Sequence, residues 1–99
     1  MNPFETRLLG NTGIKIPSLG FGGAPLGELF EKVEHLQAIE TLDEAYASGI
    51  RYYDTAPWYG QGLSEHRLGN LLHQKNRHEF ILSTKVGRVY RPFKGDPVL

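Results

Sequence analysis

Short apolar runs alternate along the chain with segments in which apolar residues recur at three- and four-residue spacing. The first two runs, Arg7–Leu9 and Ile14–Ile16, flank the turn-forming sequence Gly10-Asn11-Thr12-Gly13, which predicts an antiparallel hairpin. A further run, Leu19–Gly23, predicts a short buried strand. Glycines weaken a strand, so their presence there indicates the close approach of another backbone or of a ligand.

The pattern becomes helical from about Val33 to Ser48. One apolar face is formed by residues at helical spacing, namely Leu36, Ile39, Leu42 and Tyr46, with Ala38 and Ala45 beside them. Gly49 then stands where a helix commonly ends in the left-handed conformation. A second helix is predicted from Ser64-Glu65 onward, with Ser64 as its N-cap. Its apolar stripe consists of Leu68, Leu71 and Leu72.

Two more strands complete the pattern. Ile50–Asp54 is rich in branched and aromatic residues, and Phe80–Val86 follows the second helix. Beyond Gly87 the chain contains Pro and Gly together with Arg88, Arg91 and Lys94, which is typical of a loop. The order hairpin, β, α, β, α, β, loop predicts an α/β fold with parallel strands joined by right-handed crossovers.

The length of the chain changes this interpretation of the fold. Three parallel strands and two helices leave open sheet edges and an uncovered face, whereas parallel sheets are normally covered on both sides. A (β/α)₈ barrel needs about 250 residues, and this chain has 99. We therefore interpret residues 1–99 as the amino-terminal portion of such a barrel, preceded by a β-hairpin. The alternative is a small three-stranded α/β domain.

The composition excludes several classes. Eleven basic and eleven acidic residues balance, with a pI near 6.9, which argues against a nucleic-acid or membrane-surface partner. The chain has no cysteine, so it can form neither a disulfide scaffold nor a thiolate metal site. It shows neither a signal peptide nor about 18 consecutive apolar residues. We expect a soluble, cytoplasmic protein.

Candidate chemistry lies at the carboxyl ends of the predicted strands, where parallel α/β folds place their reactive residues. Asp54 ends one strand and Lys85 lies near the end of the next. Neighbouring strands are about 4.8 Å apart, so these two side chains can form an ion pair. Tyr59 lies in the loop that leaves the first of these strand ends.

These three residues together suggest a proton relay. A tyrosine has an ordinary pKa of about 10, so it serves as a general acid near neutrality only beside a cation that stabilises its phenolate. Lys85 can provide that cation, and Asp54 can orient Lys85 and keep it charged. Taken singly, each residue has a simpler explanation: a turn aspartate, a surface tyrosine and a solvated lysine. Their combination at matching strand ends favours catalysis.

The same residues resemble a known family, the aldo-keto reductases. The resemblance covers essentially the whole chain. It rests on residues 7–13, which lead to 19–22, and on the segments 49–60, 64–69 and 83–87. The Asp54-Thr55-Ala56-Pro57-Trp58-Tyr59-Gly60 segment is the most specific of them. Within the family the chain looks most similar to the aldose 1-dehydrogenase branch, with pyridoxal 4-dehydrogenases near it, through residues 59–65 and 85–88.

This resemblance implies a (β/α)₈ barrel that binds NADP or NAD at the carboxyl ends of its strands. Tyr59 would exchange a proton with the carbonyl oxygen, and Lys85 and Asp54 would adjust the acidity of its hydroxyl. Asp54 would also lie beside the nicotinamide ribose, and Gly22 and Gly23 would let the backbone approach the cofactor. Trp58 would line the substrate mouth, although plain packing explains it equally well. Gly20-x-Gly22 lacks the rest of a dinucleotide fingerprint, so a Rossmann fold is disfavoured.

The fourth catalytic residue of the family is a histidine that follows a strand beyond Lys85, and residues 1–99 do not reach it. The histidines present do not match that position: His35, His66, His73 and His78. None is spaced with carboxylates as a metal site would require, so we expect no metal. Arg88, Arg91 and Lys94 could meet a phosphate, but a solvated loop is the better interpretation.

These observations lead to one functional hypothesis and one alternative. The complete protein would transfer a hydride between NADP or NAD and a small aldehyde or the anomeric carbon of an aldose. Its partners would be this carbonyl or sugar substrate, with no nucleic acid and no membrane. The alternative is a non-catalytic protein on the same scaffold, either a barrel remnant or a regulatory-subunit-like protein. The sequence that follows Leu99 separates the two.

Overall fold

The computed structural model describes residues 2–88, which contain a hairpin and a three-stranded parallel sheet with two α-helices. The elements follow in chain order as β1 (Thr6–Leu8), β2 (Lys15–Pro17), β3 (Phe21–Gly22), the 3₁₀ helix η1 (Ala24–Gly27), α1 (His35–Ala47), β4 (Tyr52–Asp54), α2 (Leu63–Leu72), the 3₁₀ helix η2 (Arg77–Glu79) and β5 (Ile81–Ser83). The predicted order of strands and helices is therefore confirmed for the described residues.

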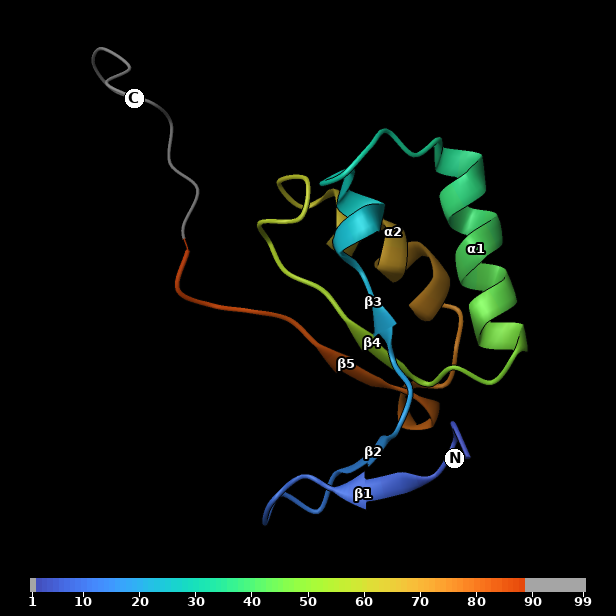
Figure 1. The fold of residues 1–99 in the computed structure, drawn as a ribbon, viewed down its shortest axis with the longest axis vertical. Helices are drawn as coiled ribbons and strands as arrows, with labels where there is room; N and C mark the ends of the chain where they lie inside the picture. The colour runs from blue at the N-terminus through green and yellow to red at the C-terminus, as the bar shows by residue number, and fades with distance from the viewer. Residues whose placement is uncertain (1, 89–99) are drawn as a thin grey trace.

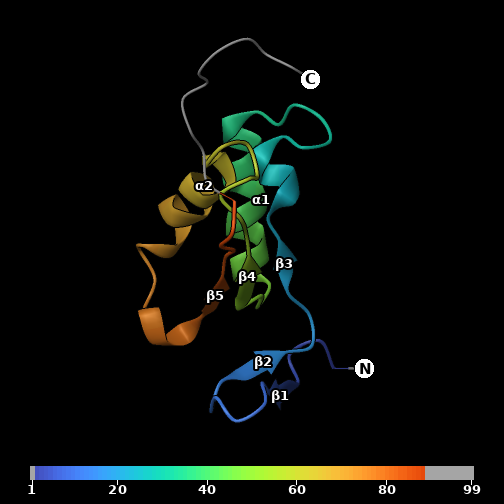
Figure 2. The same ribbon diagram turned by 90° about the vertical axis from the view of Figure 1, so that its left-hand side faces the viewer.

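The hairpin and the parallel sheet lie at different ends of the molecule. Strands β1 and β2 pair antiparallel, and they stand apart from α1 and α2 in both views (Figures 1 and 2). The chain then enters β3 and runs toward η1, so the hairpin lies at the end where the parallel strands begin. The carboxyl ends of the strands are thus at the opposite end and are left open to the loops.

The parallel strands are ordered β3-β4-β5, and their carboxyl ends are level with one another. Gly22 pairs with Asp54, and Asp54 in turn pairs with Ser83. The last rung of this ladder is the hydrogen bond from the Thr55 amide to the Ser83 carbonyl oxygen, 2.9 Å. This explains why β5 is shorter than the predicted strand 80–86, because its neighbour β4 ends at Asp54.

The hydrophobic core forms between the sheet and the two helices. Tyr53 of β4 is fully buried and packs with Leu42 of α1 and Leu68 of α2. Figure 1 shows α1 and α2 side by side, and residues of the two helices are in contact. Because alternate residues of a strand point to opposite faces, burial of Tyr53 turns Tyr52 and Asp54 to the other face of β4.

Helix α1 buries a narrower face than the sequence pattern predicted. Ala38, Leu42 and Tyr46 are buried, whereas Leu36 is 66% exposed. The buried positions recur every four residues, and Leu36 lies outside that row. The predicted helix ending is confirmed, because α1 ends at Ala47 and Gly49 adopts a φ of +104°. The helix end therefore uses glycine as predicted.

The predicted N-cap of α2 is wrong. Gly62, with a φ of +97°, occupies the cap position, and Ser64 lies inside the helix with its side chain fully buried. The Ser64 hydroxyl donates to the Gly23 carbonyl oxygen at 2.7 Å and shares a 2.7 Å hydrogen bond with the Thr55 hydroxyl. Ser64 thus connects α2 to the ends of β3 and β4 and does not cap its own helix.

Arg67 connects α2 to the part of the chain that precedes α1. Its guanidinium is buried and donates to the carbonyl oxygens of Leu26 and Val33 at 3.0 and 2.9 Å. These acceptors lie in η1 and in the segment that leads to α1.

Among the described residues no helix is long and apolar enough to span a membrane.

Candidate active site

Asp54 and Lys85 form an ion pair across the ends of β4 and β5, as the sequence predicted. The Lys85 Nζ lies 3.0 Å from the Asp54 Oδ2 and also donates to the Thr55 carbonyl oxygen at 3.1 Å. The Lys85 side chain is 50% exposed and the Asp54 side chain 39%, so the pair is accessible from solvent. Level strand ends in the sheet explain the contact, because Asp54 pairs with Ser83, two positions before Lys85 on the same face.

Tyr59 also lies beside Lys85. The Lys85 Nζ is 5.1 Å from the centroid of the Tyr59 ring, and Tyr59 itself is half-buried. The structure therefore brings together the three residues that were predicted to form the relay. Lys85 is the central member, between the Asp54 carboxylate and the Tyr59 ring.

A close backbone contact fixes the Tyr59 segment. A Cβ atom at Gly27 would lie 2.3 Å from the carbonyl carbon and oxygen of Tyr59, a distance that no side chain tolerates. A Cβ atom at Gly60, which has a φ of +71°, would likewise lie 2.5 Å from the Gly27 carbonyl oxygen. Glycine at both positions lets the loop carrying Tyr59 pack directly on the end of η1. The sequence showed these glycines, but their pairing depends on the fold.

The electrostatic environment favours the charged forms of both members of the ion pair. Burial raises the pKa of Asp54, but hydrogen bonds from Ser83 and Lys85 and the charge of Lys85 outweigh it, so the pKa lies below the ordinary 3.8. The hydrogen bond to Asp54 raises the pKa of Lys85 above the ordinary 10.5 and outweighs the effect of burial. Near neutral pH, Asp54 is therefore a carboxylate and Lys85 an ammonium.

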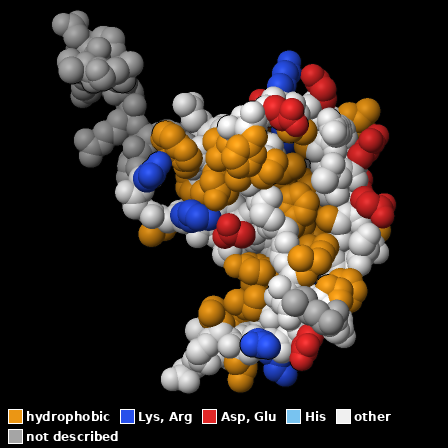
Figure 3. All heavy atoms as spheres, viewed as in Figure 1, with side chains coloured by type: hydrophobic (Ala, Val, Ile, Leu, Met, Phe, Trp, Pro, Cys, Tyr) orange, Lys and Arg blue, Asp and Glu red, His pale blue; other side chains and the backbone are white. Residues whose placement is uncertain are grey.

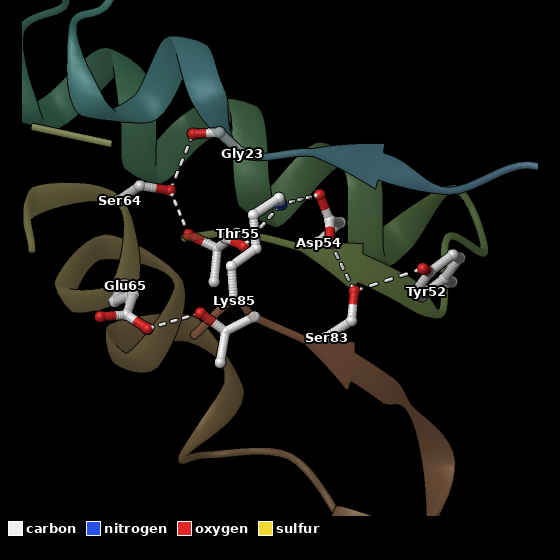
Figure 4. A network of polar contacts seen from close by, with 9 residues as sticks. Gly23, Tyr52, Asp54, Thr55, Ser64, Glu65, Ser83 and Lys85 are labelled. Atoms are coloured by element: carbon white, nitrogen blue, oxygen red, sulfur yellow. Dashed lines mark hydrogen bonds and ion pairs between the residues drawn. The ribbon is translucent and has the colours of Figure 1, made fainter. Parts of the chain in front are cut away.

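Ser83 and Tyr52 extend the site on the same face of the sheet, and sequence analysis did not single them out. The Ser83 hydroxyl donates to the Asp54 Oδ1 at 2.6 Å, and the Tyr52 hydroxyl lies 3.2 Å from the Ser83 Oγ. Figure 4 shows this row of side chains beside the ion pair. The alternation of residues along the predicted strands was the available signal, because it placed Tyr52 with Asp54 and Ser83 with Lys85.

A cavity of about 380 Å³ opens beside the ion pair. Its lining consists of Ala56, Pro57, Trp58, Tyr59, Lys85, Val86 and Arg88. This volume is within the usual range of small-molecule sites. Trp58 is 51% exposed, and the Arg88 guanidinium lies 5.0 Å from the centroid of its ring. Tyr59 and Lys85, which can take part in acid–base chemistry, thus line the same open pocket as the Trp58 ring.

Gly22 and Gly23, predicted to approach a cofactor, differ in their surroundings. Gly22 is exposed, and a Cβ atom there would meet nothing within 4 Å. Gly23 is buried, and a Cβ atom there would lie 2.7 Å from both the Asp54 carbonyl oxygen and the Ser64 Oγ. Packing of β3 against β4 and α2 therefore requires glycine at position 23. The approach of either glycine to a cofactor stays a prediction.

The remaining candidates lie away from this site or outside the described residues. His35 begins α1, His66 lies in α2, His73 follows α2 and His78 lies in η2. Within residues 2–88, no three His, Asp or Glu side chains are grouped as metal ligands. Arg91 and Lys94 fall outside the described residues.

The family of this chain is decided by comparison with known proteins. The model of the aldo/keto reductase family matches residues 18–97, which include all three residues of the relay. The chain belongs to the aldo/keto reductase family. The resemblance noted in the sequence is thereby confirmed.

Two curated members of the family are similar to this chain. A D-threo-aldose 1-dehydrogenase from Pseudomonas sp. is 54% identical over 80 residues, covering 81% of this chain and 24% of that protein. A pyridoxal 4-dehydrogenase from Microbacterium luteolum is 47% identical over 85 residues, covering 86% and 25%. The predicted similarity to this branch is confirmed, and the chain spans about a quarter of the length of these relatives.

A solved aldo-keto reductase confirms the fold class. The enzyme from Bacillus halodurans, in its holo form, matches with a TM-score of 0.75 and 36% identity, over 89% of this chain and 28% of its own length. The described residues are thus the amino-terminal portion of a (β/α)₈ barrel with its preceding hairpin. In that fold the carboxyl ends of the strands carry the active site, which is where Asp54, Tyr59 and Lys85 lie.

Proposed function

We propose that this chain is the amino-terminal part of an oxidoreductase that transfers a hydride between NADP or NAD and a small carbonyl compound. The substrate would be an aldehyde or the anomeric carbon of an aldose. The observation that carries the proposal is the position of Lys85, which is hydrogen-bonded to Asp54 and lies against Tyr59 at the wall of a cavity. Family membership and the aldose dehydrogenase among the relatives support it.

The three side chains would divide the proton chemistry among them. Tyr59 would give its hydroxyl proton to the substrate oxygen during reduction and accept a proton from it during oxidation. Lys85 would stabilise the phenolate form by its charge, since an ammonium beside a phenolate lowers the cost of proton loss. Asp54 would hold Lys85 in place and keep it protonated, in agreement with the raised pKa of Lys85.

The residues at the strand ends fit the nicotinamide end of a cofactor. Each oxygen of the Asp54 carboxylate accepts one hydrogen bond, from Ser83 or Lys85, and keeps a lone pair for a ribose hydroxyl. Gly22, the partner of Asp54 in the sheet, leaves open space above the backbone. The cofactor would supply or accept the hydride. Asp54 and Gly22 would bind it, and Trp58 would border the substrate.

The length of the chain relative to its relatives makes the whole protein part of the proposal. Strands β3, β4 and β5 form an open sheet, whereas a barrel closes. Figure 3 shows hydrophobic side chains spread over one face of the molecule. Leu82 and Val86 are large hydrophobic residues that are exposed, at 41% and 97%. We propose that the rest of a barrel follows in the complete protein and covers such surfaces. A cytoplasmic location is part of the same proposal.

The test is an assay of hydride transfer by the complete protein with NAD or NADP and a panel of aldoses and aldehydes. We expect activity with at least one such substrate. Lys85→Met, which keeps the length of the side chain and removes its charge, should lower kcat by about 100-fold or more. Cofactor binding measured by fluorescence should persist in this variant. Absence of activity with every substrate, or full activity of Lys85→Met, would contradict the proposal.

A further inference from the structure

A row of hydroxyl groups crosses the face of the sheet that points away from Tyr53. The Tyr52 hydroxyl lies 3.2 Å from the Ser83 Oγ, and the Ser83 Oγ lies 2.6 Å from the Asp54 Oδ1 (Figure 4). Tyr52 and Asp54 are alternate residues of β4, and Ser83 is the partner of Asp54 on β5. All three side chains are half-buried, so their hydrogen bonds are partly shielded from water.

The direction of these hydrogen bonds follows from the protons available. An ionised carboxylate only accepts, so the Ser83 hydroxyl must donate its single proton to Asp54. The hydrogen bond between Tyr52 and Ser83 must then be donated by Tyr52. The row therefore runs in one direction, from the phenol through the serine to the carboxylate, and each donor polarises the next.

This row determines which way the Asp54 carboxylate faces. The terminal torsion of an aspartate is broad, so the carboxylate turns easily unless its oxygens are held. Ser83 holds Oδ1, and this leaves Oδ2 directed at the Lys85 Nζ at 3.0 Å. Lys85 in turn lies against the Tyr59 ring. The orientation of the ion pair thus depends on a serine that does not touch the cavity.

We propose that Ser83, oriented by Tyr52, is the positioning residue that aligns Asp54 with Lys85 and so sets the geometry of the relay. Its effect on catalysis rests on the proposed function, because it acts through Asp54 and touches neither substrate nor cofactor. A serine that merely joins two strands would leave kcat unchanged when it is replaced by alanine. The two roles therefore differ in what they predict for kcat, and the titration of Asp54 shows whether the Ser83 hydrogen bond acts on its carboxylate.

Ser83→Ala in the complete protein tests the proposal, with Thr84→Val as the matched control. Thr84 is the next residue, and its hydroxyl bonds Glu65 of α2 at 2.7 Å, away from Asp54. The readout is the titration of the Asp54 carboxyl carbon by NMR. Asp54, Lys85 and the tyrosines at positions 52 and 59 are the titratable groups of this cluster. We expect a higher midpoint in Ser83→Ala, the wild-type midpoint in Thr84→Val, and rescue in Ser83→Thr.

Kinetics give a second readout. Ser83→Ala should lower kcat by about tenfold, as expected for the loss of one hydrogen bond to a charged group, while the KM for the carbonyl substrate changes little. Ser83→Thr should restore kcat. A wild-type titration midpoint for Asp54, or a wild-type kcat, in Ser83→Ala would overturn the proposal.

If Ser83→Ala does not fold, Tyr52→Phe replaces it, because that variant removes only the hydroxyl that orients Ser83. It should shift the Asp54 midpoint upward by a smaller amount, and an unchanged midpoint would overturn the proposal. If the complete wild-type protein shows no hydride transfer, the proposed function fails, and the Asp54 titration still decides the role of Ser83.

Discussion

Lys85 makes two hydrogen bonds at the carboxyl end of the sheet, to the Asp54 carboxylate and to the Thr55 carbonyl oxygen. Both acceptors belong to the end of β4 and the residue after it. The Lys85 Nζ also lies 5.1 Å from the centroid of the Tyr59 ring. A lysine held in this way can act on the tyrosine without losing its own proton, because Asp54 raises its pKa.

The ion pair predicts how stability depends on pH. The pKa of Asp54 is lowered, so its contribution is complete above about pH 4 and is lost as the pH falls through the lowered value. The pKa of Lys85 is raised, so its contribution is complete below about pH 10 and is lost as the pH rises through the raised value.

Asp54→Asn in the complete protein checks this dependence. We expect it to be less stable than wild type by about 1 kcal/mol or less at neutral pH, since the pair is exposed. Urea unfolding across the pH range should show the difference shrink at both extremes. A difference that stays constant between acid and alkaline pH would contradict the cited shifts.

Gly27 gives a prediction about the position of Tyr59. Gly27→Ala places a Cβ atom against the Tyr59 carbonyl group, so the loop must move. A shift of about 1 Å in a catalytic group can cost roughly 100-fold in rate, and we expect a loss of that order in kcat. Gly69→Ala is the control, because a Cβ atom there meets nothing within 4 Å. Equal kcat values for the two variants would contradict this account of the loop.

At the scale of elements, the sequence predicted what depends on local pattern. Periodicity identified both α-helices, short apolar runs identified the strands of the described residues, and the alternation of strands with helices implied a parallel sheet. That arrangement places strand ends side by side, which is why Asp54 and Lys85 could be paired without a structure. The bounds of the strands differ by up to three residues, because a strand ends where its neighbour ends.

What the sequence could not show depends on partners distant in the chain. Ser64 beside an acidic residue has the pattern of an N-cap, yet its hydroxyl bonds Gly23 and Thr55, which only the fold brings near. Leu36 has the right spacing for a buried face, yet the core lies on the side of Leu42. Ser83 is ordinary as a strand residue and becomes significant only beside Asp54.

Ser64 provides the prediction at this scale. Ser64→Ala leaves the buried carbonyl oxygen of Gly23 without this donor and should destabilise the complete protein by about 1–3 kcal/mol. Urea unfolding measures the change. Ser48→Ala, which removes an exposed hydroxyl bonded to Glu44, is the control and should change stability by under about 0.5 kcal/mol. Equal effects of the two substitutions would show that the buried hydrogen bonds of Ser64 contribute no more to stability than an exposed hydroxyl does.

At the scale of the whole molecule, the described residues would form one side of the proposed site. Two strand ends and one loop supply Asp54, Lys85 and Tyr59, and the sheet that carries them is three strands wide. The chain spans 24% and 25% of the length of its two curated relatives described above. The proposed barrel would supply the remaining walls of the cavity.

The isolated 99-residue chain should therefore show no measurable hydride transfer. The physical reason is that the open sheet leaves the ion pair and the cavity exposed to water, which weakens electrostatic stabilisation of a transition state. Absorbance of NADH or NADPH at saturating substrate measures this directly. Turnover by the isolated chain would contradict the proposal that the rest of the barrel is required.

The most direct test of the account is the kcat of Tyr59→Phe in the complete protein, measured together with the dissociation constant of the cofactor. Tyr46→Phe is the matched control. Tyr46 lies on α1 and does not line the cavity, and the variant removes a hydroxyl that donates to Glu79. The account predicts that Tyr59→Phe loses most of kcat while cofactor binding is retained, and that Tyr46→Phe keeps its kcat. Wild-type carbonyl reduction by Tyr59→Phe would contradict the assignment of Tyr59 as the proton donor.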